Sequence, residues 1–141
     1  MPTEMHVRAV HEGGMRFAAT AGDYAVTLDY PLEPGEATAG PTPLQMLLTS
    51  LAVCSGSTVA LVLKGMKQPF AGLEVDARAE RSDQHPTVLT HIALVFTVRG
   101  PEVEPEAVQR AITVAETQLC PVWAMLKPCT PIKASYRLTT D

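Results

Sequence analysis

The chain has 141 residues, of which 46% are hydrophobic and 18% charged, and its formal net charge is −4. This size suits one globular domain, residues 1–141, that can bury a core without disulfides or metals. No basic run occurs, which argues against binding to nucleic acid or to a membrane surface. The start MPTEMHVRAV is too polar for a signal peptide, so we expect a cytoplasmic protein with reduced thiols.

The first 30 residues predict a three-stranded antiparallel meander. Strands are expected at residues 5–10, 15–20 and 24–30, the last with strict alternation of apolar and polar side chains. The pair Gly13-Gly14 is typical of the turn in a hairpin. A loop rich in proline and glycine follows at residues 31–41.

A run without any charged residue, TPLQMLLTSLAVCSGSTVALVL at residues 42–63, predicts a long central helix. Thr42 fits the N-cap, Pro43 the first helical position and Gln45 the third position of a capping box. The helix should end near Lys64-Gly65. Its many polar side chains argue against a membrane span, so we expect it to be buried on nearly all sides.

One row of this helix carries only small side chains, at Ala52, Gly56 and Ala60. A row of small residues allows another backbone to approach closely. We therefore expect a second helix there, such as the same helix of a second subunit.

The rest of the chain predicts two strands at residues 73–81 and 87–99, helices at 106–119 and 122–126, and a last strand at 132–138. The apolar stripe of the first of these helices consists of five side chains: Val108, Ala111, Ile112, Ala115 and Leu119. The sequence thus predicts an α+β fold with the order βββ-α-ββ-α-α-β.

The three cysteines differ in their predicted surroundings. Cys54 lies in an apolar helical line with Leu47, Leu51, Thr58 and Leu61, so it is either core packing or a thiol that needs a nearby cation such as Arg16. Cys120 precedes Pro121 at the start of a short helix, where backbone N–H groups would favour its thiolate. Packing between helices is the alternative. Cys129 stands between two prolines and has no assigned role.

The other constellations of polar residues are weak. His6, His11, His85 and His91 are scattered without the spacing of metal ligands, so no metal and no cofactor are expected. The run Cys54-Ser55-Gly56-Ser57 lacks the strand–turn–helix setting of a hydrolase nucleophile.

Two segments, GPTPLQMLLTSLAVCSGSTV and ETQLCPVWAMLK, resemble the OsmC/Ohr family of thiol-dependent peroxidases, and most closely its smaller subgroup of predicted redox proteins. The resemblance extends over essentially the whole chain. It implies an intertwined homodimer in which each long helix is buried against its mate. It also implies a role in oxidative stress, with a small organic hydroperoxide as substrate.

The resemblance further implies roles for individual residues. Cys54 matches the peroxidatic cysteine, whose thiolate attacks the peroxide, and Cys120 matches the resolving cysteine, which closes a disulfide. A dithiol reductant, of lipoyl type in some relatives, would restore both thiols. Arg16 matches the arginine that supports the thiolate.

This sequence departs from the family where the well-studied peroxidases carry a glutamate that pairs with the arginine. Here the matching stretch is Leu44-Gln45, which offers no charge. The arginine could then support the thiolate more strongly, or lose its anchor and leave a weak enzyme. A non-enzymatic dimer that senses redox state or binds a small ligand is therefore the alternative function.

Overall fold

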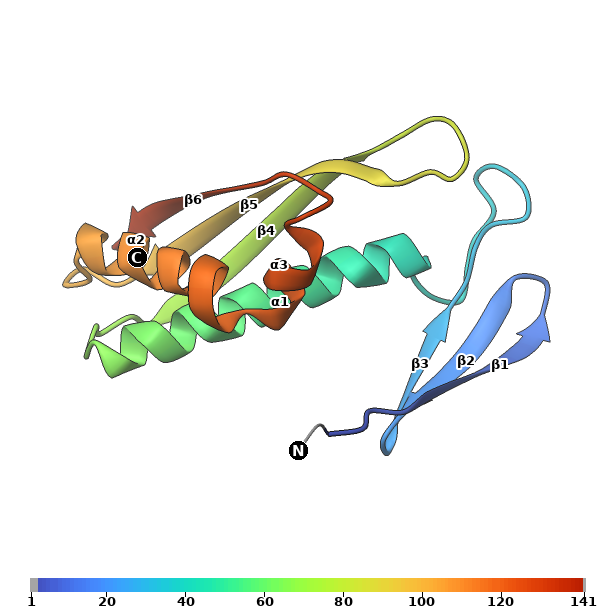
Figure 1. The fold of residues 1–141 in the computed structure, drawn as a ribbon, viewed down its shortest axis with the longest axis horizontal. Helices are drawn as coiled ribbons and strands as arrows, with labels where there is room; N and C mark the ends of the chain where they lie inside the picture. The colour runs from blue at the N-terminus through green and yellow to red at the C-terminus, as the bar shows by residue number, and fades with distance from the viewer. Residues whose placement is uncertain (1–2, 141) are drawn as a thin grey trace. The chain divides into compact units, whose positions relative to one another are not determined.

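The computed structural model describes residues 3–140 and contains the predicted order of strands and α-helices, with one π turn between the second and third helices. The chain forms two compact units that meet between Leu47 and Leu48, inside the first helix. Each unit is described by itself. Figure 1 labels the helices and strands that follow.

The N-terminal unit is the predicted antiparallel meander, with neighbours in the order β1-β2-β3. Its strands are β1 (Val7–Gly13), β2 (Arg16–Ala21) and β3 (Tyr24–Leu28). The turn between β1 and β2 uses Gly13 and Gly14 at φ values of 127° and 54°, which only glycine adopts readily. Among residues 3–47 none is buried, so this sheet has no core of its own within the chain.

Helix α1 (Pro43–Gly65) starts and ends close to the predicted positions. The capping box forms as expected, because the Thr42 N–H donates to Gln45 Oε1 at 2.9 Å and the Gln45 N–H donates to Thr42 Oγ1 at 3.2 Å. These two bonds satisfy backbone donors that the first helical turn leaves without partners.

Within the single chain only one face of α1 is buried, so burial on nearly all sides, which requires a second subunit, stays a prediction. That face carries Leu51, Ser55, Gly56, Val59 and Leu63. Apolar side chains elsewhere on the helix stay in solvent, with Val53 62% and Leu61 66% exposed. In residues 3–140, α1 is also the one helix that is long and apolar enough to cross a membrane. The core helix of a soluble protein meets the same criteria of length and composition.

The C-terminal unit contains a second three-stranded sheet with the order β4-β5-β6. Its strands are β4 (Gly72–Arg81), β5 (Leu89–Arg99) and β6 (Ile132–Thr139). Strands β4 and β5 form an antiparallel pair, while β6 runs parallel to β5 because two helices carry the chain back between them. Figure 1 shows α1 and these helices along one face of the sheet. The buried side chains of β5 join the core there: Ile92, Leu94, Phe96 and Val98.

Gly56 lies where α1 approaches this sheet closely. A Cβ atom at Gly56 would stand 2.8 Å from Val75 Cγ2 on β4. The small side chain therefore lets the helix pack against a strand of its own chain. This corrects the prediction that the row of Ala52, Gly56 and Ala60 meets a second helix at Gly56.

Helix α2 (Pro105–Val114) is shorter than predicted, because the π turn η1 (Ala115–Leu119) replaces its last residues. Helix α3 (Pro121–Leu126) follows directly after Cys120. The predicted stripe is confirmed at Val108, Ala111, Ile112 and Ala115, which are buried. It is wrong at Leu119, which is 50% exposed because the wider π turn carries that residue off the buried face.

Candidate active site

Cys54 lies on α1 at the margin of its buried face. Its side chain is half-buried and packs against the core of the C-terminal unit. The predicted apolar line through Cys54 is correct at Leu51 but wrong at Leu47 and Leu61, which are exposed. Cys54 therefore sits between core and solvent, in contrast to a fully buried thiol.

Cys120 is the residue between the π turn and α3, with extended backbone angles of φ −80° and ψ 108°. Its N–H donates to the carbonyl of Ala115 at 2.9 Å, which is the i to i−5 bond of the π turn. Its own carbonyl accepts the N–H of Ala124 at 3.1 Å and opens α3. Two helix ends thus fix Cys120, and its side chain is only 2% exposed.

The structure brings the thiols of Cys54 and Cys120 together. Cys54 acts on the Cys120 thiol through its side chain, so the two residues are neighbours, and both cysteines are in the free thiol form. They come from α1 and from the junction of η1 with α3. Two neighbouring thiols can be joined by oxidation to a disulfide.

The pKa of the Cys120 thiol is raised above its ordinary value. Burial is the main cause, and the hydrogen bond and charge of Cys54 act in the same direction. The backbone amides of Trp123 and Val122 lower the pKa, as expected at the start of a helix, but they do not outweigh burial. The prediction that the helix terminus makes Cys120 an acidic thiol is therefore wrong.

Cys129 is exposed and is not part of this pair. Its N–H donates to the carbonyl of Leu126 at 3.1 Å in the turn that ends α3. Among residues 3–140 no group of three or more His, Cys, Asp or Glu side chains could hold a metal ion.

Arg16 begins β2 in the N-terminal unit, and its Nε lies 3.4 Å from Oε1 of Glu12 on β1. Sequence reasoning missed this carboxylate. A signal for it exists, because Glu12 and Arg16 flank the Gly13-Gly14 turn and a hairpin brings such positions together. Gln45 accepts the N–H of Thr42 in the capping box. The roles of Arg16 and Gln45 at the Cys54 thiol stay predictions.

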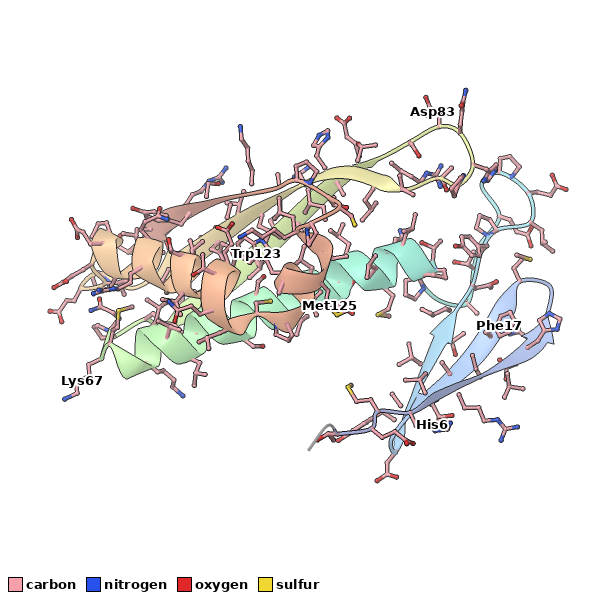
Figure 2. All side chains as sticks on the ribbon, viewed as in Figure 1. His6, Phe17, Lys67, Asp83, Trp123 and Met125 are labelled. Carbon is pink, nitrogen blue, oxygen red and sulfur yellow. The ribbon has the colours of Figure 1, made fainter. Side chains whose placement is uncertain are left out.

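Trp123 is a second feature that the sequence did not indicate. Helix α3 carries Trp123 and Met125, both labelled in Figure 2, which are 1% and 80% exposed. Of the side-chain nitrogen and oxygen atoms in residues 3–140, Trp123 Nε1 is the one that is buried without a hydrogen-bond partner. An unpaired buried donor costs free energy, so the burial of Trp123 Nε1 lowers the stability of the folded protein.

The fold is a small α+β domain of the order βββ-α-ββ-α-α-β, with one cysteine on its long helix and a neighbouring cysteine just before a short helix. The family model for OsmC-like proteins matches residues 34–135, and the chain belongs to this family. Protein YhfA of Escherichia coli (strain K12) is 33% identical over 98 residues, which cover 70% of this chain and 73% of YhfA.

Solved structures share the fold over nearly the full length. A hypothetical protein from Aquifex aeolicus VF5 has a TM-score of 0.88 at 24% identity, with 99% of each chain covered. An OsmC-like protein from Mycoplasma pneumoniae has a TM-score of 0.85 at 22% identity, again with 99% of each chain covered. An organic hydroperoxide resistance protein from Elizabethkingia anophelis has a TM-score of 0.75 at 19% identity, covering 100% of this chain and 99% of that one.

Proposed function

We propose that this protein is a thiol-dependent peroxidase that reduces organic hydroperoxides through a Cys54 sulfenic acid and a Cys54–Cys120 disulfide. The observation that carries the proposal is the placement of these two thiols as neighbours, with Cys54 half-buried on α1 and Cys120 buried at the junction of η1 with α3. Membership of the OsmC family and the likeness in fold to an organic hydroperoxide resistance protein support it.

The first step uses Cys54, because it is the member of the pair that is not fully buried. Its thiolate attacks the terminal oxygen of the hydroperoxide and breaks the O–O bond. One proton completes the alcohol that leaves, and the Cys54 sulfur is oxidised to the sulfenic acid.

The second step uses Cys120, which is buried beside Cys54. Its sulfur attacks the sulfenic sulfur, the S–O bond breaks, and water leaves with the thiol proton. The raised pKa keeps that proton on Cys120 at neutral pH, where the departing hydroxide can take it up. A dithiol reductant, with a lipoyl group as one candidate, then returns both cysteines to thiols by exchange.

We also propose that the working form is a cytoplasmic homodimer. Residues 3–47 carry a sheet without a single buried side chain, although Val7, Phe17 and Val26 are apolar. The outer side of α1 likewise leaves Val53 and Leu61 in solvent. A second copy of the chain covering these surfaces would remove both from water.

Arg16 is the proposed support for the Cys54 thiolate. Glu12 would hold this arginine from the neighbouring strand, since the two side chains form an ion pair at 3.4 Å. That pairing supplies a carboxylate that Gln45 cannot supply. Neither of the two outcomes expected from the missing glutamate then applies as stated, because the arginine is neither free of a carboxylate nor without an anchor.

Peroxide consumption tests the proposal directly. Purified protein is mixed with tert-butyl hydroperoxide and a dithiol reductant, and the rates of wild type, Cys54→Ser, Cys120→Ser and Cys129→Ser are compared. We expect Cys54→Ser to abolish turnover, Cys120→Ser to stop recycling after one equivalent of sulfenic acid, and Cys129→Ser to act like wild type. An unchanged rate in Cys54→Ser would refute the peroxidase proposal.

Mass spectrometry of the peroxide-treated protein separates the enzyme from its alternative. A Cys54–Cys120 disulfide with repeated turnover supports the enzyme. The same disulfide formed once, without turnover by any dithiol, would support a redox sensor instead. A protein in which peroxide leaves Cys54 unoxidised would favour ligand binding.

A further inference from the structure

The helix that leads to Cys120 offers two different side chains for one buried position. On a regular α-helix the residue four positions after Ala115 lies on the same face as Ala115, and that residue is Leu119. Cys120, five positions on, would lie about 140° around such a helix. Hydrophobic periodicity therefore assigns the buried position to Leu119.

The structure shows the opposite assignment. The segment Ala115–Leu119 is a π turn, and the Cys120 N–H reaches the Ala115 carbonyl at 2.9 Å. Cys120 is 2% exposed while Leu119 is 50% exposed. The one additional residue in the turn thus places the cysteine in the core and the leucine in water.

Apart from Thr117, whose Oγ1 donates to the Thr113 carbonyl at 2.7 Å, the residues inside the turn do not explain this choice. The sequence AETQL contains neither proline nor glycine, and its alanine, glutamate, glutamine and leucine all favour regular α-helix. An exposed leucine also gives up the stabilisation that its burial would bring. What the π register gains is the contact of Cys120 with Cys54.

Helix α3 is tied to the π turn. Its Trp123 Nε1 is buried without a hydrogen-bond partner among the described residues. The ion pair of Lys127 Nζ with Glu116 Oε2, at 3.1 Å, ties the end of α3 to the π turn. A change of register in the turn would therefore also move α3.

We propose that Leu119 and the π turn position Cys120 for the resolving step. In the π register Cys120 lies in the core beside Cys54. In an α register Leu119 would occupy this buried position and Cys120 would leave it. The proposal rests on the function proposed above, in which Cys120 resolves the Cys54 sulfenic acid. It adds that Cys120 and its sequence neighbour Leu119 compete for one buried position, and that this competition determines whether Cys120 can react with Cys54.

Alkylation of the reduced, full-length protein by iodoacetamide measures this competition, because Cys120 reacts only when it leaves the core. Peptide mass spectrometry follows Cys120, Cys54 and Cys129 separately, and the ratio of Cys120 to Cys54 labelling is the readout. Leu119→Gln removes the apolar competitor. We expect Cys120 labelling to become roughly tenfold slower, the size of effect that follows from losing a leucine's burial.

Deletion of Gln118 is the second variant. Cys120 then stands four residues after Ala115, so an ordinary α turn gives its N–H the same acceptor and keeps it on the buried face. We expect slower labelling of Cys120 here too. Val88→Gln is the matched control, since Val88 is also 50% exposed but lies in another part of the unit, and its labelling should equal wild type.

Oxidation by the azo compound diamide completes the test without peroxide. Diamide removes two electrons and two protons from the thiol pair to give the disulfide, and both variants should form it at least as fast as wild type. Equal Cys120 labelling in wild type and Leu119→Gln would overturn the proposal, as would slower disulfide formation in that variant. Should one variant fail to fold, the other decides by the same readout. Loss of hydroperoxide turnover alone would count against the proposed function and leave the labelling result standing.

Discussion

Replacing Gly56 by alanine sets two opposing effects against each other at the contact of α1 with β4. The new Cβ would stand 2.8 Å from Val75 Cγ2, closer than carbon atoms pack, so helix and strand must separate. Overpacking of this kind costs about 1–3 kcal/mol. Alanine in place of glycine inside a helix gains about 1 kcal/mol. The sum is a loss of up to about 2 kcal/mol in the free energy of unfolding.

Val75→Ala provides the matched background, because it removes the Cγ atom that the new methyl group would meet. In that background Gly56→Ala should stabilise the protein by about 1 kcal/mol, the helix propensity alone. The two substitutions should therefore couple by about 1–3 kcal/mol. Gly65→Ala serves as a control, since a Cβ there meets nothing within 4 Å. Urea unfolding at one fixed protein concentration measures all the variants.

Equal effects of Gly56→Ala in the two backgrounds would refute the assignment of Gly56 to the contact with Val75. The small-residue row would then be a contact with a second helix, as the sequence alone indicates. Stability changes that grow at low protein concentration would identify that second case, because they would arise from dissociation of subunits.

Three further outcomes are expected. Thr42→Ala should cost about 1 kcal/mol in urea unfolding by removing the cap on the Gln45 N–H, whereas Thr38→Ala, in the preceding loop, should cost less. The free energy of unfolding should fall as pH rises through 9.0, because the unfolded Cys120 thiol ionises there while the folded thiol stays protonated. The Cys120→Ala variant should lose this pH dependence. A flat pH profile in the wild type would contradict the prediction. Val53→Asp should shift sedimentation from dimer to monomer, and a wild type that sediments as a monomer would remove the basis of this prediction.

Most of the secondary structure could be predicted because its signals are local. The capping box Thr42-Pro43-Leu44-Gln45 fixes the start of α1, and Gly13-Gly14 fixes the first turn. Alternation along β4 identifies its buried side. Each of these signals depends on residues only a few positions apart, which interact in the same way in any surrounding fold.

The surroundings of the two thiols could not be predicted, since they depend on contacts between distant segments. The amides of Val122 and Trp123 act on Cys120 as its position before a helix indicates. The stronger effect is burial, which comes from packing of η1 and α3 on the core. Sequence spacing carries no measure of that packing, so the direction of the pKa shift was predicted wrongly.

The difference between Leu119 and Cys120 shows why the pairing of thiols needs the structure as well. A helical period of 3.6 residues predicts Leu119 in the core, and only a turn of the π type exchanges it for Cys120. The two cysteines therefore differ in their exposure to solvent. Cys54 stays half-buried on a regular helix, where a peroxide can reach it, while Cys120 is held protonated behind it. The order of attack proposed here follows from access to solvent and does not require Cys120 to be the more acidic thiol.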